Sequence, residues 1–149
     1  MYRFTRHVSR CDTYVVAPRA RLMWTDAYIG WPFREGGRSR SGIDGLGLYL
    51  LVSRERLGRV LPDLACTRAQ AVRQRLAEAQ RAAWAPVPRA EVREGDLVLL
   101  RAGGHLAHVG YAVDGAWMLH IEEALGSRLA RYDRPPTVSR VEGVYRYDG

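Results

Sequence analysis

Two histidines lie on either side of a strong turn signal in the last third of the chain. His108 and His120 flank the dipeptide Asp114-Gly115, which is typical of a two-residue turn between antiparallel strands. If this dipeptide forms the turn, His108 lies opposite Ile121 and His120 lies opposite Val109. The imidazoles are then near neighbours, and the strand register decides whether they share a face of the sheet. Such pairs are more often structural than catalytic, so the pair alone is a weak indication of an active site.

The second candidate for chemistry is the start of a helix. The stretch from Glu35 to Gly42 is rich in glycine and serine and predicts a loop, and an apolar stretch follows Asp44. A helix beginning there would present unpaired backbone N–H groups and the positive end of its dipole at residues 44–46. This position suits a nucleophile whose charged form needs support, or a bound anion. We interpret Asp44 itself as a helix cap rather than an acid catalyst.

A zinc site is a further alternative. His105, His108 and His120 could ligate the metal, with Glu122 or Glu123 as a base. Residues three apart on a regular strand point to opposite faces, so His105 and His108 would need a loop between them. An all-histidine site is also a weak motif. We therefore expect neither a metal nor a cofactor.

The helix that carries the second candidate is predicted from Asp44 to Gly58. An acid precedes it, arginines occupy its last turn, and a glycine follows it, which are helix start and stop signals. Because its sequence is apolar nearly all round, we expect it to be buried. Gly45 and Gly47 in its first turn each cost roughly 1 kcal/mol relative to alanine. Something other than helix propensity therefore accounts for these glycines.

The remaining elements predict helices first and strands afterwards. Trp24 to Ile29 predicts a short helix, and residues 13–16 predict a short strand. A capping box at Thr67 and Gln70 opens an amphipathic helix that ends near Trp84. Five short strands are predicted at Leu97 to Arg101, His108 to Val113, Trp117 to Ile121, Arg128 to Tyr132 and Gly143 to Tyr147. This order indicates an α+β fold, with helices packed on a C-terminal antiparallel meander.

The length of 149 residues fits one folded domain. We divide the chain into an arginine-rich N-terminal arm, residues 1–22, and a domain over residues 23–149. The longest apolar run, Leu46 to Val52, is far shorter than the roughly 20 residues of a membrane-spanning helix. No apolar segment of a secretory signal follows the first arginines, so we expect no signal peptide. Cys11 and Cys66 are too few for a disulfide framework and are interpreted as reduced or incidental thiols.

The chain has a net charge of +7. All of the positive side chains counted in this charge are arginines, because the chain has no lysine. Arginine suits phosphate and carboxylate contacts, which makes nucleic acid or an acidic partner a hypothesis. The arginines are scattered, however, and no nucleic-acid-binding motif accompanies them. A GC-rich coding sequence explains the same composition, and nucleic acid is the disfavoured partner.

Several stretches together carry a resemblance to a known family. They are Tyr28 to Gly37 (YIGWPFREGG), Gly42 to Leu48 (GIDGLGL), Glu94 to Leu99 (EGDLVL), His108 to His120 (HVGYAVDGAWMLH) and Gly143 to Arg146 (GVYR). With these motifs the chain resembles the NlpC-type papain-like cysteine peptidases, which are peptidoglycan endopeptidases. The similarity is greatest to the versions encoded in phage tail and gene-transfer-agent clusters, and it spans about Trp24 to Tyr147.

The resemblance assigns a role to each candidate residue. In this family the second stretch reads Asp-Cys-x-Gly-Leu, and its cysteine lies at the N-terminus of the central helix. The nucleophile position here is Gly45. The resemblance implies that His108 is at the position of the base and His120 at that of the residue that orients the base.

Neighbouring positions also differ from the family pattern. Phe33 stands where many members have a tyrosine that serves the active site, and Leu46 stands where serine or tryptophan is usual. Together with Gly45, these changes favour natural loss of activity over an engineered substitution. Residues that could still line a binding site are Trp31, Phe33, Asp44 and Leu46.

A glycine has no nucleophilic atom, so the resemblance implies a peptidase fold without peptidase chemistry. We expect a catalytically inactive structural component of a phage or phage-like tail, at the baseplate or tail tip. Its partners would be other tail or baseplate proteins, and its location the virion after assembly in the host cytoplasm. Binding of a peptidoglycan peptide or glycan is left open. The alternatives are an active peptidoglycan endopeptidase that helps the tail penetrate, and a basic nucleic-acid-binding module.

Overall fold

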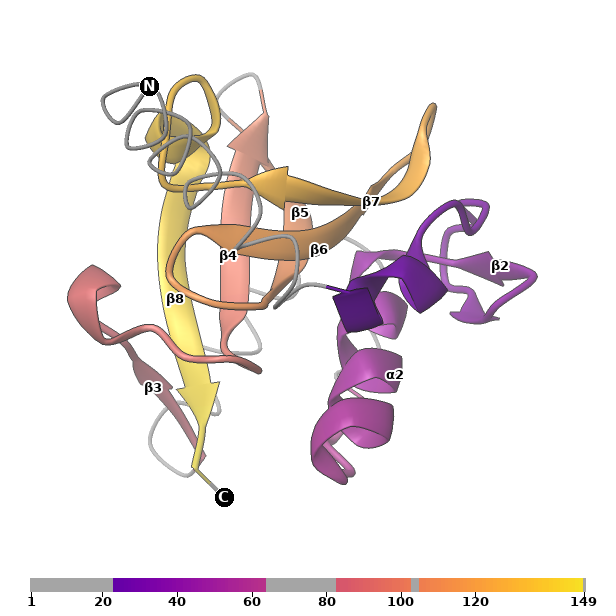
Figure 1. Cartoon of the computed structure of the whole chain (residues 1–149), viewed down its shortest axis with the longest axis horizontal. Coiled ribbons are helices and arrows are strands. Elements are labelled where there is room, and N and C mark those ends of the chain that lie inside the picture. The colour runs from indigo at the N-terminus through magenta and orange to yellow at the C-terminus, as the bar shows by residue number, and fades with distance from the viewer. Residues whose placement is uncertain (1–22, 64–82, 103–104, 149) are drawn as a thin grey trace, which may run out of the picture.

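A computed structural model of the protein describes residues 23–63, 83–102 and 105–148 (Figure 1). The N-terminal arm with Cys11 and the strand predicted at residues 13–16 lie outside the described residues. So do Cys66 and most of the amphipathic helix predicted from Thr67. No helix in the described ranges is long and apolar enough to cross a membrane.

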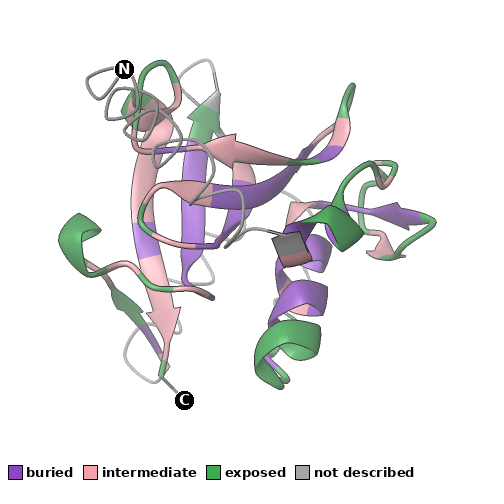
Figure 2. Cartoon of the chain, in the orientation of Figure 1, coloured by how far each residue is buried: buried purple, intermediate pink, exposed green. Residues whose placement is uncertain are grey.

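The central helix α2 runs from Gly45 to Leu57, as the capping signals predict. Asp44 precedes it in an extended conformation, and its carboxylate accepts a hydrogen bond from the backbone N–H of Gly47 (2.8 Å). Gly58 ends the helix with a φ of +66°, a conformation that favours glycine. The buried residues of α2 lie in its first three turns, and its C-terminal turn is exposed (Figure 2).

Six antiparallel strands form the main sheet, in the order β3-β8-β4-β5-β6-β7 (Figure 1). Their bounds are β3 Trp84–Pro86, β4 Leu97–Ala102, β5 His105–Ala112, β6 Trp117–Glu122, β7 Gly126–Arg131 and β8 Val141–Tyr147. Three short 3-10 helices, η1 Met23–Tyr28, η2 Arg89–Glu91 and η3 Thr137–Arg140, connect or flank these elements. The α+β fold class and the five predicted strands are confirmed.

The topology departs from the predicted meander in two ways. The last strand, β8, lies between β3 and β4, so only β4 to β7 follow one another as a meander. Trp84 begins the strand β3 rather than ending a helix, and Pro86 belongs to that strand. β3 is an edge strand, where a proline does not interrupt a ladder on both sides. Its proline led the sequence analysis to expect a break in the chain.

The glycine-rich stretch before α2 is a small hairpin rather than a loop. Strands β1 Arg38–Ser39 and β2 Gly42–Ile43 pair antiparallel within it. The hairpin lies close against the first turn of α2. The approach is so close that a Cβ at Gly47 would clash with the backbone oxygen of Gly37. Close backbone approach therefore explains one of the two costly glycines of the helix.

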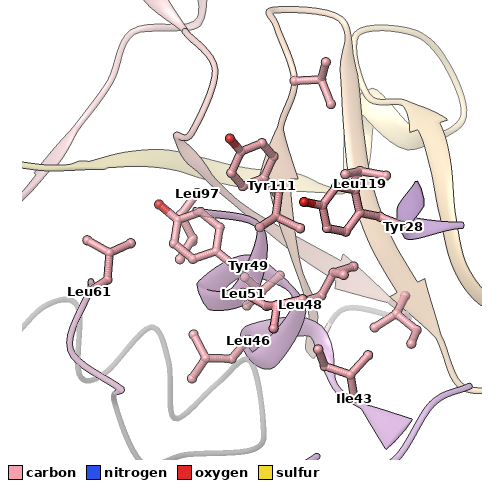
Figure 3. Packing of buried hydrophobic residues seen from close by; sticks show 14 of the residues in the cluster. Tyr28, Ile43, Leu46, Leu48, Tyr49, Leu51, Leu61, Leu97, Tyr111 and Leu119 are labelled. Carbon is pink, nitrogen blue, oxygen red and sulfur yellow. The ribbon is translucent and has the colours of Figure 1, made fainter. Parts of the chain in front are cut away.

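The sheet is buried on both faces. On one face, α2 packs through residues such as Leu48 against Tyr111 and Leu119 (Figure 3). On the other face, Leu100 and Met118 belong to a second apolar cluster. The alternation of side chains along each strand assigns residues to the two faces. This alternation decides on which face the histidines lie.

Candidate functional site

The start of α2 is held by the buried carboxylate of Asp44. Besides capping Gly47, this carboxylate accepts hydrogen bonds from the backbone of Gly36 (2.9 Å) and from Arg38 Nη1 (2.9 Å). Asp44 is buried, and Arg38 also forms an ion pair with Asp63. The interpretation of Asp44 as a helix cap is confirmed. Its oxygens are engaged in holding the hairpin and the helix together.

β5 and β6 separate at the end where the histidines lie. In the described residues the register pairs between these strands end at Tyr111 and Leu119. Val113 donates its backbone N–H to Trp117 O across the same ladder (2.8 Å). Along a strand, every second residue directs its backbone N–H and C=O groups toward the same neighbouring strand. The backbone groups of Val109 therefore face the β6 side, as those of Tyr111 and Val113 do, but Val109 lies beyond the last β5–β6 pair. In Figure 1, β6 and β7 run across the direction of β4 and β8.

Gly45 lies against Val109, at the β5 side of this gap. A Cβ at Gly45 would be 3.1 Å from Val109 O, 3.4 Å from Val109 N and 3.6 Å from Val109 Cβ. The N-terminus of α2 therefore meets the backbone of β5 at the residue next to His108. The structure thus brings together the two regions that the sequence analysis singled out. A contact of 3.1 Å is tight, so any side chain at Gly45 requires a shift of a few tenths of an ångström.

The predicted register of the two histidines is wrong by one residue. The connection between β5 and β6, residues 113–116, has four residues rather than two. Within it the Asp114 side chain accepts the backbone N–H groups of both Ala116 and Trp117 (2.8 Å each). Ala112 pairs with Met118 and Tyr111 pairs with Leu119, so the position of His120 corresponds to that of Gly110 on β5 and not to that of Val109. A shift of one residue exchanges the faces of a strand.

The corrected register puts both imidazoles on one face of the sheet, away from the α2 core. Their ring centroids are 6.1 Å apart and their planes are nearly perpendicular, at 87°. His120 shares its face with Met118 of the second cluster, and His108 lies opposite Leu100. Both histidines lie on strands that border the gap beside Gly45.

Burial keeps both histidines neutral near pH 7. Burial lowers the pKa of His120 to about 4, with the neighbouring His108 and two arginines adding to the effect. Burial also lowers the pKa of His108, and the positive charge of Arg140 contributes. Glu122 opposes both shifts, and its Oε1 lies 4.0 Å from His120 Nε2. A neutral imidazole is the form that can accept a proton.

Two of the four expected binding residues are accessible. Trp31 and Phe33 are half-buried and pack against the α2 core, and the guanidinium of Arg40 lies 4.7 Å from the Trp31 ring centroid. Asp44 and Leu46 are buried. The side chains of Trp31 and Phe33 therefore present surface to solvent, whereas Asp44 and Leu46 lie buried at the start of α2.

Sequence reasoning missed three of the four polar residues around His120. Glu122, Arg128, Thr137 and Arg140 line a pocket beside the imidazole. Glu122, which the sequence analysis considered only as a base of the zinc alternative, lies two residues after His120 on the same strand face. The other three come from β7 and η3, and no local pattern relates them to a histidine on β6.

The zinc alternative receives no ligand set from the described residues. Among them, no group of three or more histidine, cysteine, aspartate or glutamate side chains could hold a metal ion. The side chain of His105 is outside this description, although its backbone belongs to β5.

The chain matches the NlpC/P60 family over residues 30–144. It is 30% identical over 120 residues to the murein DD-endopeptidase MepS/murein LD-carboxypeptidase of Escherichia coli K12. That alignment covers 78% of this chain and 56% of the relative, so the chain spans little more than half the length of that protein.

Solved structures share the fold. A protein of the NLP/P60 family from Staphylococcus aureus, described as similar to a lipoprotein, superposes with a TM-score of 0.58 at 22% identity, covering 87% of this chain and 39% of that one. The NlpC/p60 domain of the peptidoglycan hydrolase SagA superposes with a TM-score of 0.56 at 20% identity, covering 85% of this chain and 95% of that domain. From these matches and the architecture above, the chain belongs to the NlpC/P60 family.

Proposed function

We propose that this NlpC/P60 domain binds a cell-wall peptide or a protein partner without cleaving it. The observation that carries the proposal is Gly45, the first residue of α2, at the β5 side of the gap between the two histidine strands. In the cysteine peptidases that the sequence resembles, this position supplies the thiolate. Without a nucleophilic atom, covalent catalysis is lost and only binding and electrostatic effects remain.

The rest of the site is suited to binding. The N-terminus of α2 carries the positive end of the helix dipole, which favours a carboxylate or another anionic group nearby. Trp31 and Phe33 offer half-buried aromatic surface close to the same helix. An extended peptide with carboxyl groups fits this combination, and the relative named a murein endopeptidase makes peptidoglycan peptide the first ligand to test.

The proposal includes a structural role in a phage or phage-like tail, with other tail or baseplate proteins as partners and the virion as location. Its support is the sequence similarity to tail-associated family members, including the GVYR stretch at Gly143 to Arg146. Mass spectrometry of purified tail particles from the source organism checks this part. Absence of the chain from such particles would exclude a virion role and leave the binding proposal intact.

The central experiment incubates the purified protein with insoluble murein. We expect the protein to sediment with the murein and no stem-peptide fragments to be released above a buffer control. The matched variant Trp31→Ala should sediment less, and Arg93→Gln, an exposed change elsewhere, should behave like the wild type. Release of fragments that is lost in His108→Ala would instead establish the alternative, an active peptidoglycan endopeptidase.

A further inference from the structure

A pocket of about 140 Å³ opens on the sheet face away from α2, between β6, β7 and η3. Its apolar side is formed by Leu100, Met118 and Ala130 of the second cluster. A cavity of this order holds a molecule of about six non-hydrogen atoms, such as benzene. The pocket therefore has room for a small metabolite or a single residue, and not for a polymer.

His120, one of the residues that line the pocket, has a buried nitrogen without a partner in the described part of the chain. His120 is 4% exposed, and its Nδ1 is buried without a hydrogen-bond partner among the described residues. Buried polar atoms are nearly always paired, so this unpaired nitrogen makes His120 an unusual member of the pocket lining. The imidazole is neutral near pH 7, so one ring nitrogen can donate and the other can accept.

The charged side chains that line the pocket are of both signs. Arg128 lies directly opposite His120 in the β6–β7 register, and it makes no ion pair within the described part of the chain. Arg140 is anchored on the other side by a hydrogen bond from its Nε to Arg101 O (2.7 Å). Glu122 contributes one carboxylate to the same wall. Two cations and one anion around an apolar floor match a ligand that itself carries both charges.

We propose that this pocket binds a small α-amino acid as a zwitterion. The carboxylate pairs with the guanidinium groups of Arg128 and Arg140, which suit carboxylates geometrically. The ammonium group pairs with Glu122, and the small side chain rests on the apolar floor. The Thr137 hydroxyl, which lines the same pocket, completes the hydrogen bonds. This binding is independent of the proposed function, because it holds whether or not the chain cleaves peptide.

The test titrates the full chain with alanine and follows the backbone and imidazole resonances by NMR. We expect saturable shifts at His120 and Arg128. The variant Arg128→Gln, on an exposed strand position, should weaken binding about tenfold because a charged hydrogen-bonding partner is lost. The control Arg93→Gln removes an exposed arginine outside the pocket and should leave the affinity unchanged.

Acetate and methylammonium, each carrying one of the two charges, should bind at least tenfold more weakly than alanine. Affinity for acetate equal to that for alanine would overturn the assignment of the ammonium group to Glu122. Saturable shifts that persist unchanged in Arg128→Gln, or no shifts with alanine at all, would overturn the site. Thr137→Val is a second variant, nearly isosteric, should Arg128→Gln lose its folded spectrum, and it should also weaken binding.

Discussion

The two halves of the candidate site differ in how tightly they are built. In the helix half, Asp44 makes three hydrogen bonds that tie the β1–β2 hairpin to α2, and Gly47 leaves no room for a side chain. In the histidine half, the β5–β6 ladder ends before His108 is reached, and His120 Nδ1 has no partner in the described residues. The rigid half therefore presents a glycine, Gly45, at the first position of its helix, while the open half holds two neutral imidazoles.

Introducing a thiol at Gly45 gives the largest expected effect on this contrast. In Gly45→Cys, the new side chain enters the gap bordered by both histidine strands, and we expect stem-peptide cleavage to rise about 10³-fold over the wild type, still below a complete triad. Release of peptides from murein measures the change. Gly45→Ala supplies a Cβ without a thiol and should stay at the wild-type rate, as should Gly45→Cys combined with His108→Ala. A Gly45→Cys protein that folds but cleaves nothing would show that the histidine half is out of position.

Removing the carboxylate of Asp44 should lower the free energy of unfolding. In Asp44→Ala, α2 loses its cap and the partner of Arg38, and the backbone N–H groups of Gly36 and Gly47 lose their acceptor. We expect a loss of about 3 kcal/mol in the free energy of unfolding, measured by urea denaturation. The matched control Asp63→Ala removes the other, exposed partner of Arg38 and should cost less than about 1 kcal/mol. Equal losses in the two variants would contradict the rigid role of Asp44.

The histidine half should be sensitive to pH. Burial lowers the pKa of His120 from its ordinary value of 6.5 to about 4. The unfolded chain therefore takes up a proton near pH 6.5, whereas the folded chain does so only near pH 4. Stability is fully present above pH 6.5 and declines as the pH falls toward 4, by about 3 kcal/mol for this group.

The control for this pH dependence is His120→Gln, since carboxylates also titrate in the same range. Urea denaturation at pH 7 and pH 4.5 should show a smaller loss in the variant than in the wild type, with a difference of about 2 kcal/mol. Identical losses would mean that His120 is solvated and charges freely in the folded protein.

Local signals predicted most of the elements. The acid before α2, the glycine after it and the alternation of residues in β4 to β8 are contained within short stretches, so the central helix and five strands could be found from the sequence. η1 was found at the position expected for a short helix, and the hairpin β1–β2 was missed because its strands have two residues each. β3 was missed because proline is a break signal unless the strand lies at a sheet edge.

The sequence by itself determined the absence of a nucleophile at Gly45, the capped helix that begins there and the presence of two histidines on consecutive strands. Only the tertiary structure decided that these histidines share a face and border the gap beside Gly45. The reason is that the register depends on the turn between β5 and β6, in which the Asp114 side chain accepts two backbone N–H groups, and the gap depends on where the ladder between these strands stops. The same holds for the pocket around His120, because η3 and β7 reach it through packing between segments far apart in the chain.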